Sequence, residues 1–213
     1  MSSVAVIDYG MGNLHSIAKA LQHADSAVEV NIVNDRQAIL KADRVVFPGV
    51  GAIRDCMQAL TALNLIPVIR EAASSKPFLG ICLGMQALLT DSEENEHTAC
   101  LNIINGHVLR FADGLMDHSG ERLKIPHMGW NEVHQKAHPL WQGIPQYSRF
   151  YFVHSYYVAP DDATVTIATA EYPDAFTCAL ARQNVFAVQF HPEKSQAVGL
   201  QLLQNFLHWD GTV

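Results

Sequence analysis

The chain has 213 residues, of which 49% are hydrophobic and 16% are charged, and its formal net charge is −7. This composition predicts a folded protein with a substantial core rather than a disordered chain. The negative charge, and the lack of a basic cluster along any expected helix, argue against nucleic acid as a partner. The apolar stretches are too short for a signal peptide or a membrane span, so we expect a cytoplasmic protein without membrane contacts.

The first third of the chain alternates short apolar runs with amphipathic stretches. Strands are expected over residues 4–7, 28–33, 45–47 and 78–81, and helices around 14–21, from Asp35 and over 60–73. This alternation of strand and helix predicts a parallel sheet with helices on both faces. The carboxyl ends of such strands meet at one edge of the sheet, where ligands bind.

Beyond Asp91 the pattern becomes richer in strands. The polar run 91–96 is expected to be a solvated loop. Strands are expected over 106–111, 128–134, 150–158, 164–168, 176–181 and 185–190, with a hairpin loop at 182–184 and a final helix over 196–207. Neither a repeat nor a flexible linker interrupts the chain. We therefore predict a single α/β domain over residues 1–213, with a mostly parallel central sheet flanked by helices and a β-rich C-terminal half.

Cys82 stands where an apolar strand runs directly into a helical pattern. Gly80 and Gly84 flank it two residues away on either side, which permits the sharp turn that exposes a nucleophile. The start of the following helix favours the thiolate. A buried structural thiol is the commoner fate of a lone cysteine, and the turn alone leaves both interpretations open. The remaining cysteines show no paired spacing and are expected to be thiols: Cys56, Cys100 and Cys178.

A histidine and a carboxylate follow the last expected strand. His191 and Glu193 are two residues apart, and in an extended chain with Pro192 between them they would face the same way. Glu193 would then bond one imidazole nitrogen and leave the other facing Cys82. A histidine at a strand end is, by itself, most often an ordinary boundary residue.

The segment Pro48–Gly51 follows another expected central strand. Its two glycines would let the backbone approach a substrate and present N–H groups to an oxyanion. The N–H of Leu83, the residue after the nucleophile, would be the second donor. On its own this segment predicts only a turn, and it gains weight because it lies at the same sheet edge as Cys82.

Taken in this order, Pro48-Gly-Val-Gly, Gly80-Ile-Cys-Leu-Gly-Met-Gln and His191-Pro-Glu resemble the class I glutamine amidotransferase family. The resemblance covers residues 4–207 and implies hydrolysis of L-glutamine to glutamate and ammonia; we expect no cofactor. It implies that Cys82 is the nucleophile, His191 the general base and acid, and Glu193 the group that orients His191. It assigns the oxyanion hole to Val50 or Gly51 with Leu83, and glutamine binding to Gly49, Gln86, Ser155 and Tyr156.

Three further segments, 8–14, 126–131 and 151–157, narrow the resemblance to the glutaminase subunits of imidazole glycerol phosphate synthases. These subunits act in histidine biosynthesis and pass ammonia to a cyclase subunit with a (β/α)8 barrel. This chain is too short to contain such a barrel, so the resemblance implies a heterodimer. It also places residues 126–131 near the subunit interface.

Two rival functions stay open. Another cysteine hydrolase, such as a peptidase or the glutaminase of pyridoxal-phosphate synthase, would use a similar sheet. A non-catalytic interaction subunit would retain the site without using it, although the intact trio of Cys82, His191 and Glu193 stands against that interpretation.

Two further patterns give only weak support for a ligand, one for a dinucleotide and one for a metal ion. Gly10-Met-Gly12 resembles part of a dinucleotide fingerprint, but His15 replaces the third glycine, so a tight turn with Asn13 capping the next helix is simpler. Among the eleven histidines, His134 and His138 have the best ligand spacing. Pro139 follows them and disfavours a helix through both, so we expect no metal site.

Overall fold

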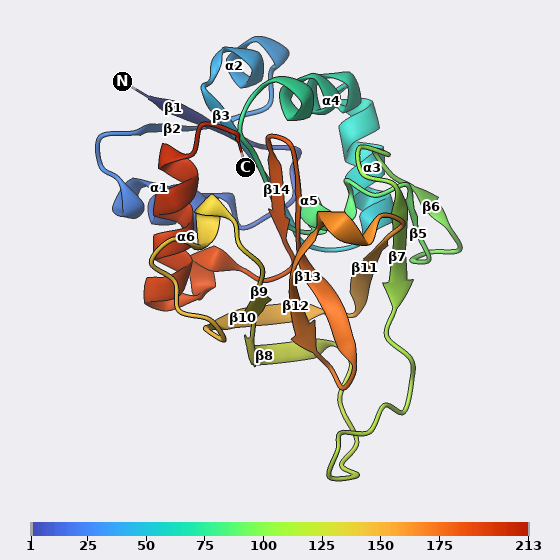
Figure 1. Cartoon of the computed structure of the whole chain (residues 1–213). Coiled ribbons are helices and arrows are strands. Elements are labelled where there is room, and N and C mark those ends of the chain that lie inside the picture. Colours follow the sequence, from blue (N-terminus) through green and yellow to red (C-terminus); the bar gives the residue numbers. More distant parts are fainter. Residues whose placement is uncertain (1, 213) are drawn as a thin grey trace.

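The computed structural model describes residues 2–212, and a parallel sheet forms its centre (Figure 1). Met1 and Val213, the ends of the predicted domain, lie outside the described residues. Five parallel strands lie side by side in the order β2 (Glu29–Val33), β1 (Ser3–Ile7), β3 (Arg44–Gly49), β4 (Phe78–Cys82) and β14 (Val185–Val188). The alternation of strand and helix predicted the four parallel strands β1 to β4 correctly, whereas β14 joins them from the C-terminal half of the chain, where only a hairpin strand was expected.

Helices cover both faces of the parallel strands (Figure 1). Side chains of β1 alternate between the faces, because successive residues of a strand point in opposite directions. Val4 and Val6 pack in one apolar cluster with residues of α1 and α6, whereas Ala5 and Ile7 pack with residues of α2, α3 and α4. These helices are α1 (Leu14–Ala24), α2 (Arg36–Lys41), α3 (Ile53–Ala62), α4 (Ile66–Ser75) and α6 (Gln196–His208).

Two local predictions in this half need correction. The helix expected over 60–73 is in fact the end of α3 and most of α4, because Asn64 adopts a φ of +52° between them. The tight turn predicted at the start is present, with φ of +86° at Gly10 and +132° at Gly12. Asn13 precedes α1 as expected, but within the described chain its side chain makes no capping hydrogen bond.

Beyond β14 the sheet continues through mostly antiparallel strands. In order these are β13 (Ala175–Arg182), β11 (Tyr156–Pro160), β7 (Gly106–Arg110), β5 (Asp91–Ser92) and β6 (Thr98–Ala99), while β12 (Thr166–Glu171) pairs with both β13 and β9 (His134–Gln135). A separate antiparallel pair consists of β8 (His127–Glu132) and β10 (Arg149–His154). The predicted hairpin is confirmed: Arg182 pairs with Val185, and Gln183, with a φ of +53°, lies in the turn.

The strand expected over 150–158 is two strands that belong to different sheets. His154 ends β10, where it pairs with His127, whereas Tyr156 begins β11, where it pairs with Arg110. Ser155 is the residue at which the chain changes sheets. The strand expected over 164–168 also begins late, because 163–165 form the 3₁₀ turn η2 (Ala163–Val165).

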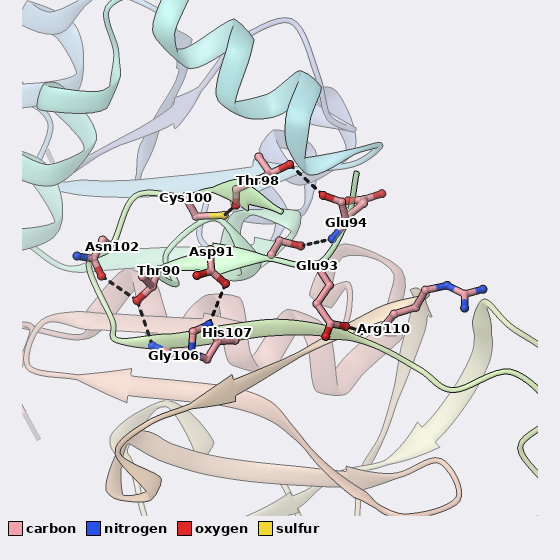
Figure 2. Close-up of polar contacts among 11 residues, drawn as sticks. Thr90, Asp91, Glu93, Glu94, Thr98, Cys100, Asn102, Gly106, His107 and Arg110 are labelled. Atoms are coloured by element: carbon pink, nitrogen blue, oxygen red, sulfur yellow. Dashed lines mark hydrogen bonds and ion pairs between the residues drawn. The ribbon is translucent and has the colours of Figure 1, made fainter. Parts of the chain in front are cut away.

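The polar run 91–96, predicted to be a solvated loop, folds against the edge of the sheet instead (Figure 2). Oδ1 of Asp91 lies 2.8 Å from Nδ1 of His107, and the backbone N–H of Arg110 donates to Oε2 of Glu93 at 2.9 Å. The prediction was wrong for Asp91 and Ser92, which form β5, whereas Glu93, Asn95 and Glu96 are exposed outside any strand as expected. Composition does not reveal that Asp91 and Glu93 have partners in β7.

Candidate active site

Cys82 ends β4 with φ of 54° and ψ of −109°, a backbone conformation that is rare for residues with a side chain. The next residue starts the short helix α5 (Leu83–Gln86). A Cβ added to Gly84 would overlap the carbonyl oxygen of Phe47, and one added to Gly80 would lie 3.1 Å from the carbonyl oxygen of Gly84. The backbone is thus as crowded as the predicted strand-to-helix turn requires.

Strand register brings the predicted segments to one edge of the sheet. Gly49, the last residue of β3, pairs with Cys82. On the other side of β4, Val188 pairs with Ile81, and His191 follows three residues later. Both neighbours of β4 therefore end beside Cys82.

A cavity of about 280 Å³ opens at this edge. The predicted site residues that line it are Val50, Gly51, Cys82, Leu83, Gln86, Ser155, Tyr156 and His191. Glu193 lies behind His191, where its side chain is 1% exposed. Gly49 is buried under the turn, and a Cβ there would lie 2.8 Å from Cβ of Leu83. Gly49 is therefore needed for close packing of the turn rather than as part of the cavity wall.

His191 and Glu193 form a buried pair. Nδ1 of His191 lies 2.8 Å from Oε1 of Glu193. Among residues 2–212, Nε2 of His191 has no hydrogen-bond partner, and the residue lines the cavity together with Cys82. Burial opposes a charge on the imidazole, but Cys82 and Glu193 outweigh it and raise the pKa of His191 above its ordinary value.

The pairing of His191 with Glu193 is as predicted, but the predicted reason was wrong. Residues after His191 form the 3₁₀ turn η3 (Pro192–Lys194) rather than extended chain. Ser195, which the sequence analysis missed, stabilises this turn. The backbone N–H of Tyr151 donates to Oγ of Ser195 at 3.0 Å, and that hydroxyl donates to the carbonyl of His191 at 2.6 Å. Its position between His191-Pro-Glu and the expected final helix was the feature of the sequence that could have pointed to Ser195.

Gln189, which directly follows β14 and is fully buried, was also missed, although an amide within the apolar run 185–190 was visible in the sequence. Its Nε2 lies 3.7 Å from Sγ of Cys82. Its Oε1 accepts a hydrogen bond of 3.0 Å from Nε2 of Gln86, which also donates to the carbonyl of Tyr156 at 3.1 Å. Gln86 is therefore connected to both the nucleophile and the chain between the two sheets.

Two charged residues add to the cavity wall, Glu94 and Lys194. Oε2 of Glu94 accepts a hydrogen bond of 2.9 Å from the backbone N–H of Ile53, at the start of α3. A small cavity with one group of each charge suits a free amino acid, which carries both an ammonium and a carboxylate. The sequence analysis had not singled out either residue.

The histidine pair considered for a metal does not share a helix. His134 lies in β9 with its ring against Tyr147, and His138 precedes the 3₁₀ turn η1 (Pro139–Trp141) with its ring against Phe186. Within residues 2–212, no three or more His, Cys, Asp or Glu side chains are grouped so that they could hold a metal ion. In the same range, every helix is too short or too polar to cross a membrane.

Residues 5–209 match the family described as Glutamine amidotransferase class-I. The chain belongs to this family. It is 66% identical over 212 residues to the imidazole glycerol phosphate synthase subunit HisH of Methylococcus capsulatus, covering 99% of this chain and 98% of the relative. It is 58% identical over 212 residues to the subunit of the same name from Nitrosococcus oceani, covering 99% of both chains.

Solved structures of low sequence identity share the class I glutamine amidotransferase fold with this chain. A structure described as a glutamine amidotransferase has a TM-score of 0.73 at 16% identity and covers 96% of this chain and 97% of its own. The structure of PurLQS from Thermotoga maritima has a TM-score of 0.71 at 17% identity, with coverage of 97% and 98%. The mixed α/β fold predicted from the sequence is therefore confirmed.

Proposed function

We propose that this chain is the glutaminase subunit of an imidazole glycerol phosphate synthase, which releases ammonia from L-glutamine for a cyclase subunit in histidine biosynthesis. The observation that carries the proposal is the buried arrangement of Cys82, His191 and Glu193 at one cavity. The identity of 66% to a HisH subunit supports the choice of pathway.

The first half of the reaction follows from the pair at the cavity. Nε2 of His191 takes the thiol proton while Sγ of Cys82 attacks the γ-carboxamide carbon of glutamine. Glu193 holds the other imidazole nitrogen in its protonated form, so that Nε2 is free to accept. His191 then returns the proton to the departing nitrogen. Ammonia leaves, and the glutamyl group stays on sulfur as a thioester.

Backbone N–H groups stabilise the charge that develops on the carbonyl oxygen. We assign this role to the N–H of Leu83 and that of Val50 or Gly51, residues that line the cavity together with Cys82. Water activated by His191 then attacks the thioester, and glutamate leaves. The close packing of Gly49 under Leu83 places these two segments side by side.

The amino-acid end of glutamine is assigned to the part of the cavity wall that Gln86, Ser155 and Tyr156 form. The charged residues Glu94 and Lys194 line the same cavity. We assign the glutamine backbone groups to these residues. The tail of the substrate would thereby direct its amide toward Cys82.

Replacing the nucleophile tests the proposal most directly. A Cys82→Ser chain, assayed with the cyclase and its nucleotide ligand, should lose glutamine hydrolysis by about 10³-fold or more while keeping its thermal midpoint. A glutamine-like electrophile should add mass at Cys82 in the unsubstituted chain. Full residual hydrolysis by the serine variant would contradict the assignment. Labelling that fails even with the partner present would favour a non-catalytic subunit.

The partner surface is assigned to the outer side of β8. Met128 and Trp130 are 61% and 38% exposed there, whereas His127 between β8 and β10 is buried. Exposed apolar side chains that alternate with buried ones are typical of an interaction surface on a strand. We assign this surface to contact with the (β/α)8-barrel cyclase in a heterodimer.

The variant Trp130→Ala should weaken co-purification with the cyclase, whereas Leu63→Ala, at an exposed position after α3, should not. Equal recovery of both complexes would argue against this surface. We also propose that residues 1–213 form one domain and that the protein is cytoplasmic; the unbroken order of strands from β2 to β6 supports the single domain. Limited proteolysis should then give no stable half-chain fragment.

A further inference from the structure

Two buried histidines face each other between β8 and β10. His127 and His154 are paired in the strand register and are 4% and 6% exposed. Nδ1 of His127 lies 2.9 Å from Nε2 of His154, and the ring of His127 stacks on Tyr172 with centroids 4.1 Å apart. The mechanism above uses neither imidazole, so their role is unassigned.

The contacts of the pair allow only one arrangement of protons. Nδ1 of His154 lies 2.8 Å from the carbonyl oxygen of Tyr156, which can only accept, so this nitrogen carries a hydrogen. In a neutral ring Nε2 of His154 is then an acceptor, and His127 must donate to it from Nδ1. Nε2 of His127 in turn accepts from the amide of Asn131, 3.3 Å away.

Both rings are neutral at ordinary pH. Burial lowers the pKa of His127 to about 4 and that of His154 to about 3. The amide of Asn131 is fixed as well, because it also donates to the carbonyl of Glu171 at 2.8 Å and its oxygen accepts from the N–H of Glu132 at 2.8 Å. Every donor in this series therefore has a defined direction.

The series continues to the nucleophile. The carbonyl of Tyr156, which accepts from His154, also accepts from Nε2 of Gln86 at 3.1 Å. Gln86 donates in addition to Gln189, whose amide lies 3.7 Å from Sγ of Cys82. Hydrogen bonds thus run without a gap from β8 to the thiol.

We propose that His127 is a positioning residue for glutamine binding, acting through His154 on the carbonyl of Tyr156. The hydrogen bond from His127 to His154 holds the chain at Ser155 and Tyr156, between β10 and β11. The carbonyl of Tyr156, held in this way, orients Gln86. His154 lines the cavity, whereas His127 is not among the described residues that do. This role rests on the proposed glutaminase function, because it concerns the wall assigned to the substrate's amino-acid end.

Two substitutions separate the hydrogen bond from the packing. His127→Phe keeps a ring against Tyr172 but removes the donor, whereas His127→Asn places an amide nitrogen close to the position of Nδ1. Steady-state glutamine hydrolysis is measured for both chains in complex with the cyclase. We expect the KM for glutamine to rise about tenfold in the Phe variant, as the loss of one buried hydrogen bond implies, and to stay within about twofold of the unsubstituted value in the Asn variant.

A purely structural role predicts a different result. Phenylalanine would then preserve the KM, or both variants would be impaired equally, and either outcome overturns the proposal. Thermal midpoints of both variants show whether the fold is kept.

Nuclear magnetic resonance of the chain with ¹⁵N-labelled histidine gives a readout that needs no activity. Both rings should show the Nδ1–H tautomer, with a coupling across the hydrogen bond from Nδ1 of His127 to Nε2 of His154. A hydrogen on Nε2 of His154 would overturn the proposal even if the Phe variant failed to fold. If the spectrum is as expected but the unsubstituted complex never hydrolyses glutamine, the proposed function fails and the hydrogen-bonded pair stands.

Discussion

The parallel and antiparallel halves of the molecule contribute to the site in different ways. The parallel strands position Cys82 and the 48–51 segment through backbone geometry: strand register, a rare φ at the nucleophile and glycines that leave no space for a side chain. The antiparallel half contributes the chain at Ser155 and Tyr156, which side-chain hydrogen bonds hold in place. The geometry around Cys82 therefore depends on a backbone that tolerates little change, whereas the segment proposed to bind glutamine depends on separate polar contacts.

The largest expected effect concerns the pair of His191 and Glu193, which follows the parallel strand β14. Glu193→Gln keeps the shape of the side chain, but its amide can donate to Nδ1 and so favours the wrong tautomer of His191. We expect hydrolysis of glutamine to slow by about 10³-fold, or about 4 kcal/mol of activation free energy. The matched control is Glu171→Gln, at an exposed position in β12. A loss smaller than tenfold would show that the carboxylate does not set the tautomer.

The next effect tests whether the backbone of the parallel half is as intolerant as its geometry indicates. Gly84→Ala should lower the free energy of unfolding by about 3 kcal/mol, because the new Cβ overlaps the carbonyl of Phe47. Gly80→Ala should cost about 1 kcal/mol, since its nearest contacts are 3.1 Å away. Urea denaturation measures both values. Equal losses would mean that the turn relaxes around either methyl group.

A separate prediction distinguishes the two halves by pH. His127 and His154 have pKa values lowered by burial, so the unfolded chain takes up protons first as the pH falls below about 6.5. The free energy of unfolding should then fall by up to about 1.4 kcal/mol per pH unit for each histidine, until the pH nears the folded-state pKa of about 4 for His127 and about 3 for His154. The raised pKa of His191 acts in the opposite direction but mainly above about pH 6.5, where the folded chain keeps a proton that the unfolded chain has lost.

Hydrogen exchange can show which strands lose stability as the pH falls, once the rates are corrected for the effect of pH on intrinsic exchange. Protection in β8 and β10 should decrease at pH 5 relative to pH 7 more than protection in β1 and β3, whose residues include no histidine. His127→Phe should reduce the difference. A uniform decrease across the sheet would show that the two halves unfold as one unit at this pH.

The difference between the halves also explains what could be predicted from the sequence. Apolar runs, glycine spacing and the short distance from His191 to Glu193 are local patterns, and they were sufficient for the parallel strands and for the trio around Cys82. The contact of Gln189 with Cys82 depends on the register of β14 against β4. No local pattern contains that information.

Longer-range pairing explains the remaining failures. The break at Ser155 follows from two different partner strands, β8 and β7, and neither is adjacent in sequence. The bond between His127 and His154 exists only because β8 and β10 pair in one register. The folded polar run 91–96 likewise requires β7 as its neighbour. Composition gave the polarity of these residues but not their partners.

The φ of 54° at Cys82 has a consequence for how this protein responds to selection. Glycine adopts such a backbone with little strain, so Cys82→Gly would relieve tension at the turn while removing the sulfur. A screen for thermal stability alone would therefore favour loss of the thiol. On the proposed function, a cysteine persists at this position only while turnover is selected together with stability.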